Sequence, residues 1–265
     1  MKPGTRALGV AVSASDRGGD GDGDPRRATV AGAVVRVDRA VDGLSFSTCT
    51  VGGTDATAAV VDCLDRLGRE DVRHLLLAGV APAWFNIVDL GAVREAADRP
   101  VLAVSFEASE GLGDPLREHF SGEALARRLA VYESLPERVP VWLDGDGGNG
   151  GGGAPDDGDP ASGAGDDGDA DPNADADPNA DADPNAEENA NADDDGRGDP
   201  ALWVRAVGVD DDEARRIVRG HTPAGRRRPE PLRVAKLAAR AGRSYLDDPA
   251  PDDADGRDPA GDADG

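Results

Sequence analysis

An aspartate at the junction of a predicted strand and a predicted helix is the first candidate for chemistry. In the segment VGGTDAT, residues 51–57, two glycines precede Asp55, and helical spacing begins shortly after it. One reading makes Asp55 a helix cap, because a carboxylate at a helix start accepts hydrogen bonds from free N–H groups. The other makes Asp55 a catalytic, metal-binding carboxylate held at a rigid corner. The sequence leaves both readings open.

A second candidate is the turn in LLLAGVAPAWFNIVDL, residues 75–90, where an apolar run opens into large and polar side chains. The chain has 3 Trp, 2 Tyr and 4 Phe, so two adjacent aromatic residues in a turn are notable. The rings could plug the end of the core, with Asn86 capping a helix. Alternatively, Trp84, Phe85 and Asn86 line a base pocket, and Asp89 adds a second catalytic carboxylate beside it.

The third candidate is a basic element in the last part of the chain. Residues 215–243 hold nine Arg and one Lys but a single acid, Glu230. Four of these bases recur at spacings of three, four and three, which makes one stripe on a predicted helix. The alternative is that these side chains pair with acidic parts of the same chain. The residues from which we predict phosphate contacts are Arg226, Arg227, Arg228, Arg233, Lys236 and Arg240.

Hydrophobic periodicity predicts the elements that must position these residues. Alternating apolar positions predict strands, and apolar residues at helical spacing predict helices. The first three strands are expected to pair antiparallel, and the order of the elements is similar to that of a ribonuclease H-like domain. The expected strands are 5–15, 29–38, 43–51, 73–78, 100–106, 139–143 and 202–209. The expected helices are 52–68, 86–97, 114–120, 122–133, 210–219 and 231–242.

Most of the charge lies in two segments. The net charge is −24, but residues 144–200 alone carry 17 Asp, 2 Glu and one Arg, and residues 246–265 carry 8 Asp and one Arg. The repeat DPNADADPNADADPNA has no apolar face, so we expect 144–200 to be a disordered acidic insert and 246–265 a disordered acidic tail. Residues 1–143 and 201–245 are then expected to form one α/β domain, a mixed sheet with flanking helices.

Composition also bounds the environment of the protein. Two lysines among 29 basic residues, with a large excess of Asp over Glu, suit a halophilic, high-salt cytoplasm. Two cysteines give neither a disulfide framework nor a zinc pair. Because no apolar run reaches ~20 residues, we expect a soluble cytoplasmic protein without a membrane partner. The sequence has no P-loop, dinucleotide fingerprint or G-x-S-x-G elbow.

Four ordered segments resemble one known family. They are VDGLSFSTCTVGGTDAT (41–57), LLLAGVAPAWFNIVDL (75–90), RPVLAVSFE (99–107) and HTPAGRRRPEPLRVAKLAARA (221–241). Together they are similar to the archaeal endonuclease dU family, which is related to endonuclease V. The resemblance implies a ribonuclease H-like fold and cutting of DNA at deoxyuridine or other deaminated bases, as in DNA repair. It also implies clustered carboxylates, Asp55 among them, that hold Mg²⁺ or Mn²⁺.

The sequence departs from the family's acidic pattern at three places. At 9–12 it reads GVAV where the family carries acids at the end of the first strand. At 52–55 it reads GGTD and keeps one Asp of two, and at 78–79 it reads AG where the family tends to have an Asp before the Gly. Alanine and valine offer no oxygen ligand to Mg²⁺. A full metal site would therefore need a substitute such as Asp16, Asp42 or Glu107.

These departures define alternatives to an active nuclease. One is a catalytically degenerate family member that binds nucleic acid, or a protein partner, without cutting. Another is that the acidic insert occupies the basic helix as a nucleic-acid mimic. Both nucleic-acid readings predict that the turn after strand 73–78 and the turn before Ala56 meet at one cleft, and that this cleft faces the basic helix.

Overall fold

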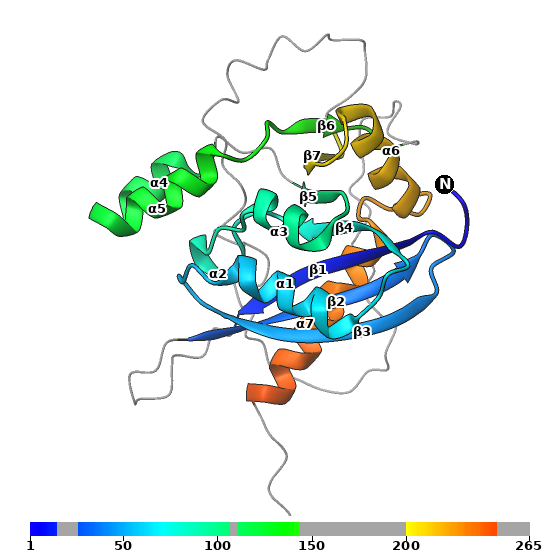
Figure 1. The fold of residues 1–265 in the computed structure, drawn as a ribbon, viewed down its shortest axis with the longest axis horizontal. Helices are drawn as coiled ribbons and strands as arrows, with labels where there is room; N and C mark the ends of the chain where they lie inside the picture. The colour runs from blue at the N-terminus through cyan, green and yellow to red at the C-terminus, as the bar shows by residue number, and fades with distance from the viewer. Residues whose placement is uncertain (15–25, 107–110, 144–199, 248–265) are drawn as a thin grey trace, which may run out of the picture.

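The chain forms a mixed sheet flanked by helices, seen in a computed structural model that describes residues 1–14, 26–106, 111–143 and 200–247 (Figure 1). The strands in these residues are β1 (Arg6–Ala14), β2 (Arg27–Arg36), β3 (Val41–Thr50), β4 (Val72–Ala78), β5 (Val101–Ser105), β6 (Val139–Val141) and β7 (Leu202–Val207). They are arranged in the order β3-β2-β1-β4-β5-β7-β6. β1, β4 and β5 pair parallel, and the other neighbouring strands pair antiparallel.

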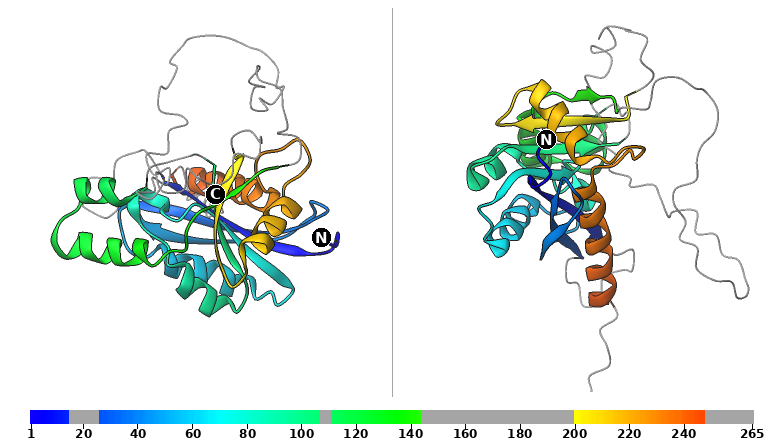
Figure 2. Two further views of the ribbon diagram at one scale, coloured as in Figure 1. Left: turned by 90° about the horizontal axis from the view of Figure 1, so that it is seen from above. Right: turned by 90° about the vertical axis from the view of Figure 1, so that its right-hand side faces the viewer.

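Helices cover both faces of this sheet. They are α1 (Ala56–Leu67), α2 (Pro82–Phe85), α3 (Leu90–Ala97), α4 (Gly113–His119), α5 (Gly122–Glu133), α6 (Asp211–His221) and α7 (Glu230–Asp247). Figure 2 shows α1 and α3 on one side of the sheet and α7 on the other. The main core lies on the α1 side, and two smaller clusters lie under α6 and α7.

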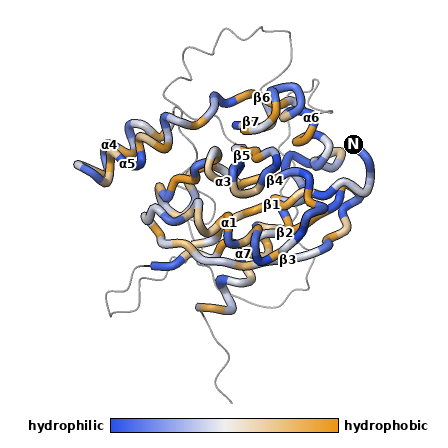
Figure 3. The backbone as a smooth tube through the Cα atoms, in the orientation of Figure 1, coloured by the Kyte–Doolittle hydropathy of each residue, from blue (hydrophilic) through white to orange (hydrophobic). Residues whose placement is uncertain are grey.

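β1 shows how the sequence builds these layers. Its side chains alternate between the faces, as in any strand. Leu8 and Val10 enter the main core, whereas Ala7 and Ala11 face the smaller clusters. Gly9 lies between those two alanines, and a Cβ added to it would be 2.2 Å from the Pro231 carbonyl oxygen. The small residues thus let the start of α7 lie directly on β1, and Figure 3 shows hydrophobic residues along that strand.

The predicted ribonuclease H-like fold, a mixed α/β sheet with flanking helices, is confirmed. The helix predicted over 86–97 begins only at Leu90, because Asp89 caps it and the backbone at Asn86 is not helical. The helix predicted to end at Gly242 continues to Asp247. The predictions for the insert and the tail lie outside the described residues, apart from their first or last residues. Strand β7, which follows the insert, inserts between β5 and β6.

Among the helices of the described residues, none combines the length and the apolar composition that a membrane span requires.

Candidate functional site

Two turns meet beyond the ends of β3 and β4. The Gly52 N–H donates to the Ala83 carbonyl at 2.8 Å, which joins the turn before α1 to the turn that contains α2. Asn86 in the second turn also bonds Thr50 at the end of β3. The part of the prediction that brought these two turns together is therefore confirmed.

Asp55 lies at the N-cap position of α1, but its carboxylate does not bond that helix. Instead it accepts hydrogen bonds from the Thr50 N–H, the Thr50 hydroxyl and Asn86 Nδ2, at 2.7–3.1 Å. Desolvation raises the pKa of Asp55, but these hydrogen bonds outweigh it and hold the pKa below its ordinary value. The carboxylate thus ties the end of β3 to the second turn.

Asn86 supplies the cap that the sequence assigned to Asp55. Its Oδ1 accepts from the Ala56 N–H at 2.9 Å, which satisfies a free donor in the first turn of α1. Its Nδ2 donates to the Thr50 carbonyl at 2.8 Å and to Asp55 Oδ1 at 2.7 Å. The side chain is fully buried. Both amide donors are therefore engaged inside the protein, and base recognition by Asn86 would require this network to open.

Asp89, the second predicted catalytic carboxylate, caps α3. Its Oδ1 accepts from the Ala92 N–H at 2.9 Å, and its own N–H donates to Thr57 Oγ1 at 2.9 Å. The first bond is an ordinary N-cap interaction. The second links the start of α3 to the first turn of α1. Asp89 thus stands next to the Asp55 turn in the fold, with one carboxylate oxygen engaged by its own helix.

The predicted base pocket separates into one exposed ring and two buried side chains. Trp84 is 40% exposed, whereas Phe85 is 2% exposed and lies in the main core with Asn86 beside it. Ala83, Trp84 and Phe85 all have positive φ, between 50° and 58°. Non-glycine residues rarely adopt this conformation, and its strain tends to concentrate at functional sites. A single solvent-facing indole, rather than a closed pocket, is the feature that this turn presents.

The Trp84 ring is held against neighbouring aromatic side chains. Its centroid lies 5.3 Å from that of Phe120 and 5.7 Å from that of His119. The ring also lies close to Gly52, where an added Cβ would be 2.7 Å from a ring carbon of Trp84. Gly52 also has a φ of 70°, which a glycine adopts without strain. These contacts fix the ring at the junction of the two turns.

Arg128 of α5 fastens both turns, and the sequence analysis missed it. The side chain is 6% exposed. Its guanidinium donates to the carbonyls of Gly52, Gly53 and Phe85, and it lies 3.8 Å from the Phe120 ring centroid. A signal was available, because Arg128 lies three residues after Leu125 and four before Tyr132, on the side of the helix that faces the core.

The neighbouring tips of β1 and β4 are apolar where a metal would be expected. These strands run parallel, with Val10 opposite Leu77, and a cavity of about 10 Å³ lies at their ends. That volume is at the lower limit for one water, and a water needs polar partners. Every lining residue is apolar or glycine: Val10, Ala11, Val12, Val60, Leu77, Ala78, Gly79, Pro82 and Val88.

This donor set does not fit a divalent cation. Mg²⁺ requires oxygen ligands in a near-octahedral arrangement. Across the described part of the chain, no group of three or more His, Cys, Asp or Glu side chains is placed to hold a metal. Of the substitutes considered, Asp42 lies at the far end of β3, paired with Arg6 at 2.6 Å. Asp16 and Glu107 lie outside the described residues.

The basic helix lies on the other face of the sheet. Ala235 of α7 packs with Ala11 and Ala33, whereas the Asp55 turn packs with the main core through Ala56. The prediction that the cleft at the two turns faces the basic stripe is therefore wrong. The reason is topological: α7 crosses β1 and β2 on the face opposite α1, and periodicity alone does not assign a helix to a face (Figure 2).

The predicted phosphate-binding residues lie in and before α7. Arg226, Arg227 and Arg228 are exposed in the segment before the helix, and the Arg228 guanidinium lies 4.4 Å from the Phe106 ring centroid. Arg233 makes a two-pronged ion pair with Glu230, at 2.9 and 2.6 Å. Arg240 is exposed on the same stripe. The alternative that these bases pair with carboxylates thus holds for Arg233.

Sheet order and turn geometry together describe a ribonuclease H-like framework, and the cavity at the ends of β1 and β4 has no acid among its described lining residues. Residues 3–147 match the family model described as Endonuclease dU. That match covers more than half of the chain, and the chain belongs to this family.

The chain is also similar to several relatives and solved structures. A UPF0215 protein of Pyrobaculum aerophilum is 26% identical over 217 residues, which span 82% of this chain and 86% of that protein. One of Pyrobaculum calidifontis is 39% identical over 82 residues, 31% of this chain, and the chain spans about half of its length (45%). A protein of unknown function from Archaeoglobus fulgidus shares the fold at a TM-score of 0.58 and 19% identity, over 89% of this chain and 97% of that one. Endonuclease V of Bacillus subtilis aligns at 0.48 and 12% identity, over 92% and 82%.

Proposed function

We propose that this protein is a catalytically degenerate endonuclease dU relative that binds DNA containing an unpaired or deaminated base without metal-dependent cutting. The observation that carries the proposal is the apolar floor at the ends of β1 and β4, lined by Ala11, Val12 and Ala78 in place of carboxylates. Two-metal hydrolysis needs charged oxygen ligands that hold the cations and orient the attacking water. The described residues offer no such cluster.

Trp84 is the side chain best placed to contact a base. It is 40% exposed and held by a backbone in a rarely adopted conformation. An indole can stack on any base that has left the DNA double helix. Such stacking tolerates any base sequence and depends little on salt screening. Arg226, Arg227, Arg228, Lys236 and Arg240 would add phosphate contacts from the opposite face of the sheet. Because Arg228 lies against Phe106, just after β5, a bound strand would pass the ends of the central strands.

The family match favours a second candidate, metal-dependent cutting at deoxyuridine. In that case Asp55 and Asp89 would act with at least one acid from outside the described residues, such as Asp16 or Glu107, and with Mg²⁺ or Mn²⁺. Asp55 would have to exchange its bonds with Thr50 and Asn86 for a metal ion. The two candidates differ in one observable, the appearance of a cut strand.

One experiment separates them. Single-stranded oligonucleotides with one uracil, one hypoxanthine or neither are incubated with the full chain in molar KCl and in dilute buffer, with Mg²⁺, Mn²⁺ or EDTA. Binding is followed by fluorescence anisotropy and cutting by denaturing gel from the same samples. We expect binding without cutting, unchanged by EDTA. Metal-dependent cutting that Asp89→Asn abolishes would overturn the proposal, because asparagine keeps the cap of α3 and removes the charge.

The binding residue is tested in the same assay. Trp84→Ala should weaken binding roughly 5- to 150-fold, since one stacked base contributes about 1–3 kcal/mol. Leu237→Ala is the matched control, because Leu237 is also an exposed large hydrophobic side chain but lies on α7. Equal affinities for the wild type and Trp84→Ala would remove Trp84 from the interface.

A further inference from the structure

β3 forms one edge of the sheet, and side chains close both of its ends. At one end, the Thr50 N–H donates to Asp55 and the Thr50 carbonyl accepts from Asn86. At the other end, the Asp42 carbonyl accepts from Arg69 Nη1 at 3.0 Å. These side chains occupy backbone groups that a further strand would otherwise use.

The middle of this edge remains open. In a strand, the N–H and C=O of one residue point to the same side, and successive residues alternate. The register with β2 runs without a shift from Thr50 to Gly43. Because the backbone groups of Thr50 point away from β2, those of Thr48, Phe46 and Leu44 do so too. Within the described residues, these six groups have no hydrogen-bond partner.

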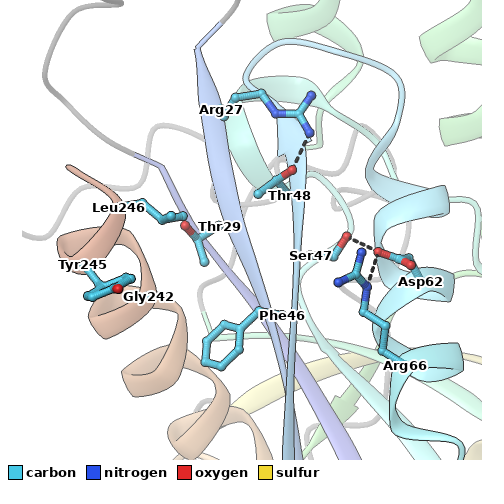
Figure 4. A pocket seen from close by; sticks show the side chains of 10 residues that line it. All are labelled: Arg27, Thr29, Phe46, Ser47, Thr48, Asp62, Arg66, Gly242, Tyr245 and Leu246. Carbon is cyan, nitrogen blue, oxygen red and sulfur yellow. Dashed lines mark hydrogen bonds and ion pairs between the residues drawn. The ribbon is translucent and has the colours of Figure 1, made fainter. Parts of the chain in front are cut away.

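A groove of about 680 Å³ runs along this open edge (Figure 4). α1 flanks it with Asp62 and Arg66, and the end of α7 flanks it with Tyr245 and Leu246. Phe46, Tyr245 and Leu246 in the groove and Leu44 on the same strand are 42–72% exposed, and they are four of the eight exposed large hydrophobic side chains in the described residues. Clustered exposed apolar side chains mark interaction surfaces.

We propose that a second copy of this chain occupies the groove by pairing its own β3 antiparallel to this one. In an antiparallel ladder, residues that exchange two hydrogen bonds must both point their backbone groups at the partner. A register centred on Phe46 meets this condition at every open position. Phe46 of one copy lies opposite Phe46 of the other, and Leu44 of each copy lies opposite Thr48 of the other. All six open groups are then paired, and the two sheets become one.

Side chains in this register are compatible as well. Phe46 would meet Phe46 on the α7 side, an aromatic cross-strand pair, with Tyr245 and Leu246 of both copies around it. Asp42, the charged residue of β3, would lie opposite Thr50 of the other copy, so no like charges face each other. Arg66 is already paired with Asp62, so Arg27, which donates to the neutral Thr48 hydroxyl, is the remaining cation of the groove lining, and one cation is a weak attraction for a nucleic acid.

The chain's own last segment is the competing occupant, because α7 ends at the groove. Residues 248–265 contain seven Asp, three Pro and three Gly. These types are depleted in strands, and proline cannot donate to a ladder. β3 itself, with Phe46, Thr48 and Leu44, has the composition that an added strand requires. Chemistry therefore favours a second copy.

Sedimentation equilibrium of the full chain tests the proposal. We expect a dimer whose dissociation constant rises at least tenfold in Phe46→Asp and stays unchanged in Leu237→Asp. Thr48→Pro is the second variant. It removes an N–H that points outward, and the β2–β3 ladder does not use that N–H. Circular dichroism checks that each variant is folded. A wild type that stays monomeric, or a dimer indifferent to both β3 variants, would overturn the proposal.

A spin label tests the register. Cys49 and Cys63 are fully buried, and burial raises the pKa of both thiols, to about 12 and about 11, so a nitroxide reagent modifies only the thiol introduced by Phe46→Cys. Facing Cα atoms in such a pair lie about 5.5 Å apart, which gives strong dipolar broadening. Absence of broadening in a dimer would exclude this register. A chain that dimerises only after residues 248–265 are removed would assign the groove to that segment and overturn the proposal.

Discussion

Asn86→Ala is the perturbation that most directly tests how the two turns are joined. The substitution removes three hydrogen bonds: from Ala56 N–H to Oδ1, and from Nδ2 to Thr50 O and Asp55 Oδ1. Two neutral bonds contribute about 1 kcal/mol each, and a bond to a carboxylate contributes about 1.5–3 kcal/mol. Because Asn86 is fully buried, water does not replace them. We expect a loss of about 4 kcal/mol in the free energy of unfolding.

Urea denaturation followed by tryptophan fluorescence measures this loss. At roughly 2–4 °C per kcal/mol for a chain of this size, the melting temperature should fall by about 8–16 °C. Asp89→Asn, which keeps a capping side chain in the adjoining turn, should change stability by under 1 kcal/mol. If Asn86→Ala lowers the free energy of unfolding no more than Asp89→Asn does, the three hydrogen bonds of Asn86 contribute no stability, and the expectation is wrong.

Three further substitutions test other parts of the account. Burial lowers the pKa of His221 to about 4. Between pH 6.5 and 4 the unfolded chain therefore binds a proton at this residue that the folded chain does not bind. The free energy of unfolding should fall by about 3 kcal/mol as the pH drops from 6.5 to 4. His221→Phe should flatten most of that slope in pH-dependent urea titrations, and an unchanged slope would exclude His221 as its source. Gly9→Ala should cost about 3 kcal/mol or more because its Cβ meets the Pro231 carbonyl, whereas Gly4→Ala, with nothing within 4 Å, should be neutral. Arg128→Met should cost about 3 kcal/mol and expose the turns to limited proteolysis, because the carbonyls of Gly52, Gly53 and Phe85 lose their donor; resistance equal to the wild type would contradict its role.

Local patterning was enough to predict most elements of the fold. The strand at Val72–Ala78 was expected over 73–78, and the helix at Gly122–Glu133 over 122–133. Apolar periodicity reports which residues face a core, and this is the information that fixes element type. The boundary at Leu90 was missed because Asn86 and Asp89 are both capping residue types, and Asn86 instead bonds Thr50, Asp55 and Ala56 in a distant segment while Asp89 caps the helix.

The site depended on contacts between distant segments. Asp55 lies at the start of α1 as predicted. The side chain that caps α1 is nevertheless Asn86, which is 31 residues further along the chain. Arg128 joins the turns from still further away, 76 residues from Gly52. Sequence spacing describes neighbours on one element, whereas these partners are neighbours only after the sheet has formed.

The sequence shows that acids are missing at the ends of β1 and β4. It does not show that apolar side chains fill the space between these ends. GVAV at 9–12 and AG at 78–79 could have been compensated by carboxylates from elsewhere. Within the described residues the space is instead filled by Val10, Val60 and Val88, which leave about 10 Å³. Such packing is a property of three segments together.

Binding of Mn²⁺ at the ends of β1 and β4 is the most direct measurement of the central claim. Manganese broadens the NMR signals of nearby amides, so a titration of the full chain reports where the ion lies, whatever the acidic segments bind elsewhere. We expect no selective broadening of the Ala11, Asp55 and Ala78 amides at equimolar Mn²⁺. Selective broadening of those three amides that Asp55→Asn removes would contradict it.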